Sequence, residues 1–333
     1  MSSNSEVFNG TIPALSRGYR RFLVTGGRGF IGSHLVRALV AADADEVIVF
    51  DNGTRRCAAR EQPFGTNVRL IDADIRDRAA LKSAMLGVDV VFHLAAQSNV
   101  MGAVADLEGS FSTNVIGTFN VFAAAHSHGV RRVVFTSSRE VYGETASIPV
   151  DEAFPLNPKN AYGVSKAAGE HYAQVFRDGG LPISVLRLSN VYGPGDAGRV
   201  IPLFIDAAMA GHPLVLYGGQ QVLDFVWIEE VVRMLVKCGL SEAYLAEPMN
   251  IGSGLGIMVR ELAERVIALT HSSSALNVLP PREVEVSRFV ANVRCAMNAL
   301  ALRIPDDPLF GLPSVIASCT RETAPHAEQQ PAT

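Results

Sequence analysis

Two side chains, separated by one helical turn, have types that could together move a proton. Tyr162 and Lys166 begin a helical pattern, so both lie on one face of the expected helix. A lysine ammonium beside a tyrosine hydroxyl favours the phenolate, lowers its pKa and lets the tyrosine take a proton from an alcohol. The same spacing is also common by chance in exposed helix pairs, so this pair is not diagnostic alone.

A hydroxyl and a carboxylate follow a strand pattern about 24 residues before Tyr162. Ser138 stands at the C-terminal end of that strand, where open α/β sheets bind ligands, although a local cap or turn is an alternative role. Glu140 lies two residues later. This carboxylate either faces a substrate or is buried and bonded to the backbone or to Arg139.

A glycine-rich loop joins the first strand pattern to the first helical pattern. Its glycines, Gly26, Gly29 and Gly32, follow the spacing G-x-x-G-x-x-G, with Phe30 and Ile31 between the last two. Glycines let the backbone turn tightly and approach a pyrophosphate, whose charge is stabilised at a helix N-terminus. The loop therefore predicts a dinucleotide site, with an ordinary strand–helix turn as the alternative.

Acidic residues end the next two strand patterns. Asp51, followed by Asn52, lies 19 residues after Gly32, where a carboxylate can accept from ribose hydroxyls. A carboxylate there repels a 2′-phosphate, so we expect NAD rather than NADP, although Arg28, Arg55 and Arg56 argue the other way. Asp51 could also simply form a turn. Asp74 and Ile75 are placed to meet the adenine, or to form another turn.

The elements that position these residues alternate between short apolar strands and helices, which predicts a parallel sheet covered on both faces. We expect an α/β, Rossmann-type doubly wound domain over residues 19–190. After it, Gly and Pro become frequent, which indicates a smaller, interleaved C-terminal substrate-binding lobe over 191–318, of which about 225–252 partly returns to the first domain. Residues 1–18 and 319–333 are polar and are expected to be disordered. The predicted strands are 22–25, 47–50, 68–71, 90–94, 133–135, 183–188 and 249–251, and the predicted helices are 31–42, 110–128, 162–176 and 228–238.

Composition excludes several classes of protein. The net charge of −4 comes without a basic stripe, which argues against nucleic acid as a partner. The four cysteines have no paired spacing, so we expect neither a disulfide framework nor a metal site. The apolar runs are too short to span a bilayer and the N-terminus does not resemble a signal peptide, so we expect a cytoplasmic protein without a membrane partner.

Five motifs in order carry a resemblance that covers roughly residues 20–312. The chain resembles the extended short-chain dehydrogenase/reductase family, specifically its NAD-dependent nucleotide-sugar epimerase/dehydratase group, and is most like UDP-sugar 4-epimerases. The combination is far more specific than any single motif. The motifs are TGGRGFIGSH (25–34), HLAAQ (93–97), TSSREVYG (136–143), YGVSK (162–166) and RLSNVYGP (187–194).

The resemblance implies roles by position. Tyr162 would be the acid/base, Lys166 would tune it and bond the nicotinamide ribose, and Ser138 would bond the sugar oxygen that becomes a ketone. Asn114 would help to hold the site. Arg288 resembles a late arginine that grips the substrate diphosphate, with a solvated surface charge as the alternative. The residues bordering the cofactor would be Leu94, Ala95, Ala96 and Gln97, and those meeting the substrate would be Asn190, Val200, Leu216 and Tyr217.

Two departures from the family pattern decide the expected chemistry. Leu223 stands where relatives often have a phosphate-gripping arginine, so Arg199 is the candidate substitute, or is a solvent-facing charge. Arg139 stands where dehydratases tend to have an Asp, so the acid needed to expel water is missing. Glu140 keeps open the reaction of UDP-glucuronate decarboxylases, which also carry a Glu here.

We therefore expect NAD-dependent 4-epimerisation of a UDP-sugar through a transient 4-keto intermediate. The leading pairs are UDP-glucuronate/UDP-galacturonate and UDP-glucose/UDP-galactose, with a slight preference for the uronate because Arg199 and Arg187 offer positive charge. The alternatives are a UDP-glucuronate decarboxylase, a nucleotide-sugar 4,6-dehydratase and a non-catalytic NAD- or nucleotide-sugar-binding regulator. The helical patterns 110–128 and 162–176 could pair in a homodimer.

Overall fold

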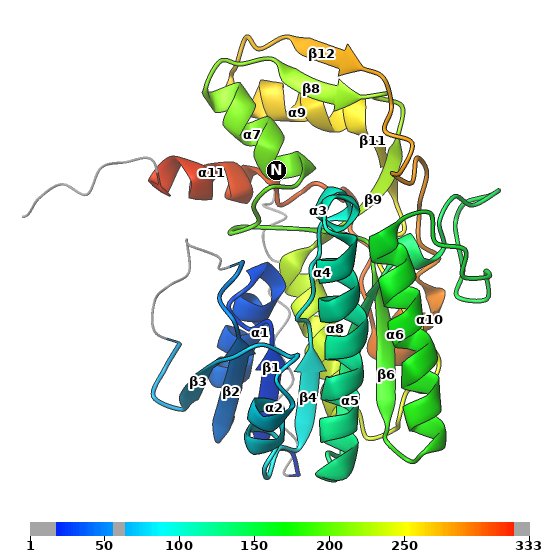
Figure 1. Ribbon diagram of the computed structural model, residues 1–333. Coiled ribbons are helices and arrows are strands. Elements are labelled where there is room, and N and C mark those ends of the chain that lie inside the picture. Colours follow the sequence, from blue (N-terminus) through cyan, green and yellow to red (C-terminus); the bar gives the residue numbers. More distant parts are fainter. Residues whose placement is uncertain (1–17, 56–63, 323–333) are drawn as a thin grey trace, which may run out of the picture.

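A seven-stranded parallel sheet forms the centre of the larger lobe (Figure 1). The structure is a computed structural model that describes residues 18–55 and 64–322. The strands are ordered β10-β6-β5-β4-β1-β2-β3 across the sheet, so the first strand along the chain is near its middle. Their bounds are β1 (Arg21–Thr25), β2 (Glu46–Asp51), β3 (Val68–Asp72), β4 (Val90–His93), β5 (Arg132–Ser138), β6 (Ile183–Leu188) and β10 (Met249–Ile251).

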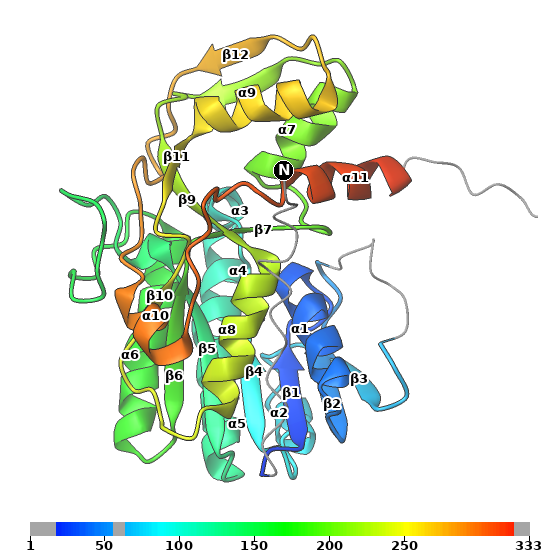
Figure 2. The same ribbon diagram turned by 180° about the vertical axis from the view of Figure 1, so that it is seen from behind.

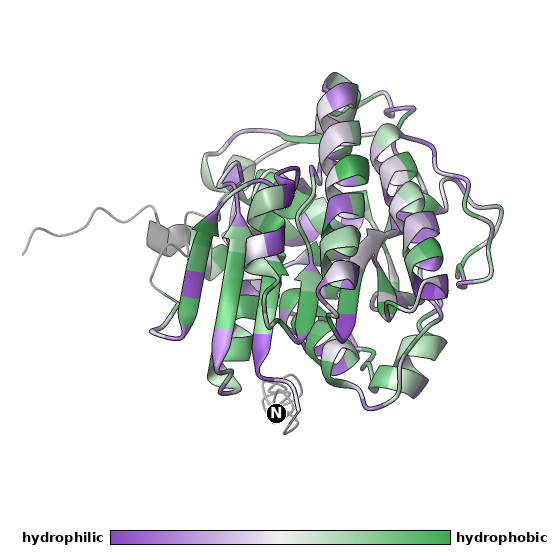
Figure 3. Cartoon of the chain, turned by 60° about the horizontal axis from the view of Figure 1, so that its bottom comes forward, coloured by the Kyte–Doolittle hydropathy of each residue, from purple (hydrophilic) through white to green (hydrophobic). Residues whose placement is uncertain are grey.

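Helices cover both faces of this sheet (Figures 1 and 2). Successive residues of β1 point to opposite faces: Phe22 and Val24 join the core beneath α1 (Phe30–Ala41) and α8 (Ile228–Leu240), and Leu23 joins the core beneath α5 (Thr118–Ser127). The second face also carries α2 (Arg78–Ala84) and α6 (Ala161–Asp178). Figure 3 shows the resulting apolar layer along the strands. The predicted Rossmann-type doubly wound class is confirmed.

The long helical segment before β5 differs from the expected single helix over 110–128. It begins earlier, with α3 (Val100–Ala105) and α4 (Leu107–Phe111), and passes through a π-helical turn at Ser112–Gly117 before α5. The turn carries Asn114 to Gln97, whose backbone N–H donates to Asn114 Oδ1 at 2.8 Å. Asn114 Nδ2 donates to Ser165 Oγ of α6 at 3.0 Å. The turn thus joins the loop after β4 to α6.

The smaller lobe combines short strands with helices above the larger lobe (Figure 1). A three-stranded sheet has the order β11-β9-β7, and β8 pairs with β12 in parallel. After β9 the chain goes back to the larger lobe, where α8 packs on α1 and β10 pairs with β6. The bounds here are β7 (Asn190–Tyr192), α7 (Val200–Met209), β8 (Leu214–Tyr217), β9 (Val222–Trp227), β11 (Gly256–Met258), α9 (Val259–Thr270), β12 (Leu276–Leu279) and α11 (Leu312–Glu322). The short helix α10 (Arg294–Leu300) packs on β10 and α8 of the larger lobe.

The chain ends differ in part from the prediction of disorder. Residues 1–17 and 323–333 lie outside the described residues, but Gly18 is in a turn and residues 319–322 are helical. The prediction is wrong for 319–322 because α11 buries Leu312 and Val315 and packs on α7 and α9, so the apolar side of the helix anchors its polar end. Among helices of the described residues, none has the length and hydrophobicity to cross a membrane.

Candidate active site

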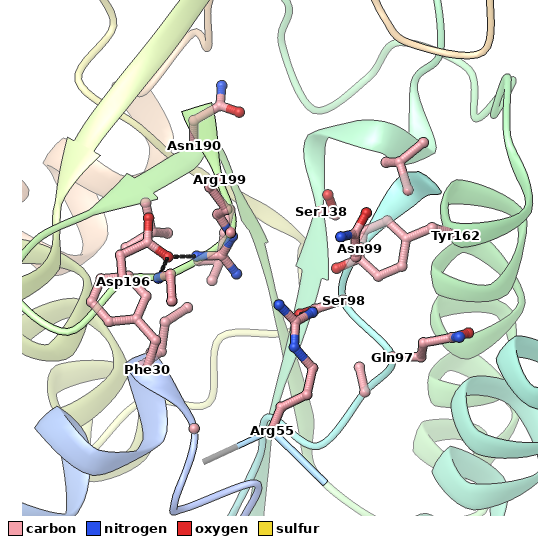
Figure 4. Close-up of a pocket in the computed structure, with 18 of the residues that line it drawn as sticks. Phe30, Arg55, Gln97, Ser98, Asn99, Ser138, Tyr162, Asn190, Asp196 and Arg199 are labelled. Atoms are coloured by element: carbon pink, nitrogen blue, oxygen red, sulfur yellow. Dashed lines mark hydrogen bonds and ion pairs between the residues drawn. The ribbon is translucent and has the colours of Figure 1, made fainter. Parts of the chain in front are cut away.

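A cavity of about 1450 Å³ lies between the C-terminal ends of the parallel strands and the smaller lobe. This is where open α/β sheets bind ligands. All of the predicted catalytic and cofactor residues line this cavity, and so do the predicted substrate residues except Arg288. Asn114 and Arg187, which were also expected to support the site, do not line it. Figure 4 shows that Ser138 and Tyr162 lie on one side of it and Asp196 and Arg199 on the other.

The glycine loop forms the floor of the cavity at the start of α1. Gly26 has a φ of +72°, and a Cβ at this position would lie 2.8 Å from the backbone nitrogen of Ala95. Only glycine therefore fits this turn. Gly29 is the N-cap of α1 and has no side chain to accept from the first-turn N–H groups. The helix N-terminus is consequently open to an anion such as a pyrophosphate.

Asp51 lies beside the glycine loop and lines the cavity. Its carboxylate is 8% exposed and accepts the backbone N–H of Arg28 at 2.9 Å and that of Gly53 at 2.7 Å. Asp51 thus forms the local turn and lines the cavity as well, so the two roles considered for it coexist. The glycine loop and this carboxylate together fit a dinucleotide whose ribose hydroxyls meet Asp51.

Asp74 is engaged with neighbouring side chains at the cavity edge. Its carboxylate accepts from Arg76 Nη2 at 2.7 Å and from Asn52 Nδ2 at 2.8 Å. The hydrogen bond from Arg76 is the main cause that lowers the pKa of Asp74 to about 2. Ile75 beside it is buried and packs under Gly117 of the π-helical turn.

We call the end of β5 and the start of α6 the catalytic wall; it comprises Ser138, Tyr162 and Lys166. The Asn160 side chain caps α6 by accepting the backbone N–H of Gly163 at 2.9 Å, which fixes where the helix begins. Tyr162 lies in the first turn, and Lys166 Nζ lies 5.9 Å from its ring centre. Tyr162 and Ser138 lie on the same side of the cavity (Figure 4), and Ser138 acts to lower the pKa of the Tyr162 hydroxyl. The structure thus brings together the three residues predicted to react.

The charge state of this wall differs from the expectation. Burial raises the pKa of Tyr162 to about 12, and the charge that opposes this most is Arg199 rather than Lys166. Burial also lowers the pKa of Lys166 to about 8, and its ammonium donates to the Thr136 carbonyl at 2.9 Å. The Lys166 ammonium is thus directed to a backbone oxygen, and its effect on the pKa of Tyr162 stays a prediction.

Glu140 is buried at the edge of the catalytic wall. One carboxylate oxygen accepts from Arg139 Nη2 at 2.9 Å, and the other accepts from Asn160 Nδ2 at 2.7 Å. Both Arg139 and Glu140 line the cavity. The alternative considered for Glu140, a buried carboxylate paired with Arg139, describes its contacts.

We call the opposite side the substrate wall; it comprises Arg199, Arg282 and their carboxylate partners. Arg199 Nη1 lies 3.0 Å from Asp196 Oδ1, and its guanidinium lies 5.6 Å from the ring centre of Phe30 in the glycine loop. Burial raises the pKa of Asp196 to about 6. Nearby, Asn190 Nδ2 donates to the Asp224 carbonyl at 3.0 Å. The remaining predicted substrate residues, Val200, Leu216 and Tyr217, lie at the start of α7 and the end of β8.

Arg282, and not Arg288, is the late arginine of the cavity. Its guanidinium stacks 3.6 Å from the ring centre of Tyr217 and pairs with Glu285 at 3.0 Å. Arg288 is exposed because the chain is extended here and the neighbouring Phe289 points into the core, so that Arg288 points outward. The signal that could have found Arg282 is its position three residues after the strand that ends at Leu279.

A second correction concerns Arg187, which was expected to offer positive charge to a substrate. Its side chain is 5% exposed, pairs with Glu170 at 2.7 Å and does not line the cavity. It therefore gives no support to a preference for a uronate. Arg55, weighed only as an argument for NADP, does line the cavity and donates to Ser98 Oγ at 3.3 Å (Figure 4).

Comparison with known proteins agrees with this geometry. The model of the NAD dependent epimerase/dehydratase family matches residues 22–252. The chain belongs to this family of enzymes. The matched range begins in β1 and ends just after β10, so it includes the whole seven-stranded sheet except for one residue.

Individual relatives carry out different reactions. The UDP-glucose 4-epimerase of Mycolicibacterium smegmatis is 34% identical over 80% of this chain and 88% of its own length. The UDP-N-acetyl-alpha-D-glucosaminuronate decarboxylase of Bacillus cytotoxicus is 34% identical over 80% and 85%. The solved dTDP-glucose 4,6-dehydratase DesIV of Streptomyces venezuelae, with NAD and TYD bound, is 33% identical, with a TM-score of 0.86 over 91% of this chain and 97% of that one. Similarity therefore supports a nucleotide-sugar enzyme without selecting the reaction.

Proposed function

We propose that this chain catalyses NAD-dependent 4-epimerisation of a UDP-sugar through a transient 4-keto intermediate. One observation carries the proposal: Ser138, Tyr162 and Lys166 meet at the cavity, and the carboxylate beside them, Glu140, is held by Arg139 and Asn160. Proton transfer to and from a sugar hydroxyl has its base there, whereas a carboxylic acid that could protonate a leaving hydroxyl does not stand at position 139.

The residues of the catalytic wall divide the work. Tyr162 takes the proton of the C4 hydroxyl while Ser138 bonds the same oxygen. NAD, when bound, accepts the hydride from C4 and returns it. The glycine loop and Asp51 orient the dinucleotide, and Lys166 adds positive charge beside Tyr162. Once the 4-keto sugar has rotated to present its other face, Tyr162 returns the proton to the C4 oxygen. The cycle consumes no cofactor, so NAD should stay bound between turnovers.

A UDP-uronate decarboxylase is the second candidate. Two observations favour it: Glu140 lines the cavity beside Ser138, and a decarboxylase is among the relatives that are 34% identical. Dehydration is less favoured, because Arg139 occupies the place of the expected Asp. A non-catalytic regulator is disfavoured because the three reactive residues are intact and lie together.

The test is product analysis. Purified protein is incubated with a panel of UDP-, dTDP- and GDP-sugars, including both leading UDP pairs, without added NAD. We expect an isomer of unchanged mass from a UDP-sugar, resolved by chromatography. A product lighter by carbon dioxide identifies a decarboxylase and one lighter by water a dehydratase. Either result, or no turnover at all, overturns the proposed epimerisation.

We also propose that the enzyme works as a cytoplasmic homodimer through α4, α5 and α6. Of these neighbouring elements, α4, the π-helical turn before α5 and α6 leave large apolar side chains in water, as expected for a surface that a partner covers. Light scattering should give twice the mass of the chain, and Val175→Glu should shift the protein to monomer. The exposed apolar residues are Leu107, Phe111, Ile116, Val164, Tyr172 and Val175.

A further inference from the structure

A buried carboxylate lies one helical turn beyond the reactive pair, and the proposed reaction does not use it. Glu170 stands four residues after Lys166 on α6, so the two side chains share one face of the helix. The Glu170 side chain is 6% exposed. A carboxylate this deep is retained only when its oxygens are bonded and its charge is balanced.

Two elements supply those partners. On β6, Arg187 donates from Nε to Glu170 Oε1 at 3.0 Å and from Nη2 to Oε2 at 2.7 Å. On β5, the Ser137 hydroxyl makes a short hydrogen bond to Oε1. Ser137 and Arg187 are paired in register in the sheet, so Glu170 binds two adjacent strands at the same level.

These contacts attach α6 to the end of β5 at two successive turns. Lys166 Nζ binds the Thr136 carbonyl at 2.9 Å, and Glu170 binds the side chain of Ser137. The next residue of β5 is Ser138, which lies on the same side of the cavity as Tyr162 from the first turn of α6. The attachment of α6 to β5 therefore determines the relative positions of the Tyr162 and Ser138 hydroxyls, which must both reach one substrate oxygen.

We infer that Glu170 is a positioning residue of this enzyme: it holds α6 on the end of β5 so that Tyr162 and Ser138 face one oxygen, and its charge stabilises the Lys166 ammonium. The inference rests on the proposed role of the catalytic wall. It does not depend on which sugar is turned over.

Several groups near Lys166 influence its pKa. Together they determine how far that pKa falls when the Glu170 charge is removed. Burial lowers the pKa of Lys166, and Glu170 is the charge that opposes this. His93 on β4 also faces Lys166, but burial lowers the pKa of His93 to about 3, so this imidazole stays neutral. The other charged groups on elements packed against α6 are Arg139 and Glu140 beside Tyr162, Arg187 on β6, Arg132 at the far end of β5, His126 on α5, and the exposed Asp106 and Glu108 at α4.

The test compares Glu170→Gln with Ser137→Ala, and uses Glu229→Gln on the exposed side of α8 as a matched control. The glutamine keeps an oxygen acceptor but loses the charge. We expect Glu170→Gln to lower kcat about tenfold, to leave KM nearly unchanged, and to move the alkaline limb of the kcat profile to lower pH by about half a unit or more. Ser137→Ala should lower kcat without moving that limb, and Glu229→Gln should match the wild type.

The outcomes separate positioning from a merely structural role. A lower Tm of Glu170→Gln with wild-type kcat and pH profile overturns the inference. If Glu170→Gln does not fold, the test rests on Ser137→Ala, which leaves the ion pair between Glu170 and Arg187 intact. An unchanged kcat of Ser137→Ala then overturns the inferred attachment of α6 to β5.

A measurement that does not require turnover separates failure of this inference from failure of the proposed function. In protein labelled with [15N]lysine, the Lys166 Nζ signal, assigned with Lys166→Arg, should titrate at lower pH in Glu170→Gln than in the wild type. Equal titration overturns the charge effect even if no sugar is turned over. A decarboxylated product would overturn the epimerase proposal and still allow the kinetic comparison.

Discussion

The two walls of the cavity hold their charges in different ways. On the catalytic wall, Lys166 and the Glu170 behind it are more than nine-tenths buried and bonded to the sheet. On the substrate wall, the side chains of Arg199 and Arg282 are 36% and 34% exposed, and each pairs with a nearby carboxylate three residues away in sequence. Buried pairs are costly to break, whereas exposed pairs contribute little. We therefore expect the catalytic wall to stay fixed and the two arginines of the substrate wall to exchange their carboxylates for phosphates, Glu285 more readily than the buried Asp196.

The largest expected effect is on the catalytic wall. Tyr162→Phe removes the base and keeps the ring, so kcat should fall by roughly 10²–10⁴-fold. NAD content of the purified protein, measured after denaturation, should remain close to that of the wild type. Unchanged turnover would refute Tyr162 as the base and would remove the main distinction between the walls.

The second prediction separates two arginines that differ in exposure to the cavity. Arg282→Ala removes a charge-assisted contact to a substrate phosphate and should raise KM by about 10–100-fold, with a smaller change in kcat. Arg288→Ala, which alters an arginine outside the cavity, is the control and should leave both constants within about twofold of the wild type. Steady-state kinetics with the substrate found in the sugar panel decides; equal effects would contradict the assignment of Arg282.

A smaller effect is expected for Arg199, because it must leave Asp196, whose side chain is 3% exposed, whereas the Glu285 partner of Arg282 is 33% exposed. Arg199→Ala should raise KM by about 3–10-fold. Since Arg199 is the charge that most lowers the pKa of Tyr162, the acid limb of the kcat/KM profile should also move to higher pH. An acid limb at the wild-type pH would show that the two walls are electrostatically independent.

The smallest expected effect is on stability and concerns a histidine buried beneath the catalytic wall. His93 is buried, and its two ring nitrogens bond the hydroxyls of Thr25 and Thr118 at 2.8 and 2.9 Å. Its pKa is lowered to about 3, mainly by burial, so below its ordinary value of 6.5 the unfolded chain takes up a proton and the folded chain does not. Stability should therefore fall as the pH falls, by about 1 kcal/mol between pH 6.5 and 5.5. Urea unfolding measures it, and His93→Asn should lose this contribution to the slope.

Much of the fold and of the cofactor side could be predicted from the sequence, because local patterns determine them. The glycine loop, Asp51 and the strand ends depend on neighbours in the chain, and all of the predicted cofactor residues line the cavity. Asp51 illustrates this point. It forms the local turn that its sequence predicts, and it also lines the cavity.

The substrate side was less predictable, since its contacts join residues far apart in the sequence. Nothing local distinguishes Arg282 from Arg288; the burial of Phe289 and the pairing of that segment with Val222 decide which arginine points outward. Arg187 was misjudged for the same reason, because its partner Glu170 lies on another element. The pKa of Tyr162 likewise depends on Arg199 from the smaller lobe, which no spacing of Tyr and Lys could reveal.

Because the chain returns to the central sheet after β9, the two lobes cannot be separated by a single cut in the sequence. A fragment that stops at Asn190 would lack β10, which covers the edge of β6, and α8, which covers one face of the sheet. It would leave unpaired backbone groups and a broad apolar surface in water. Neither half is thus a self-sufficient module, and any hinge motion between them must bend several crossings of the polypeptide at once.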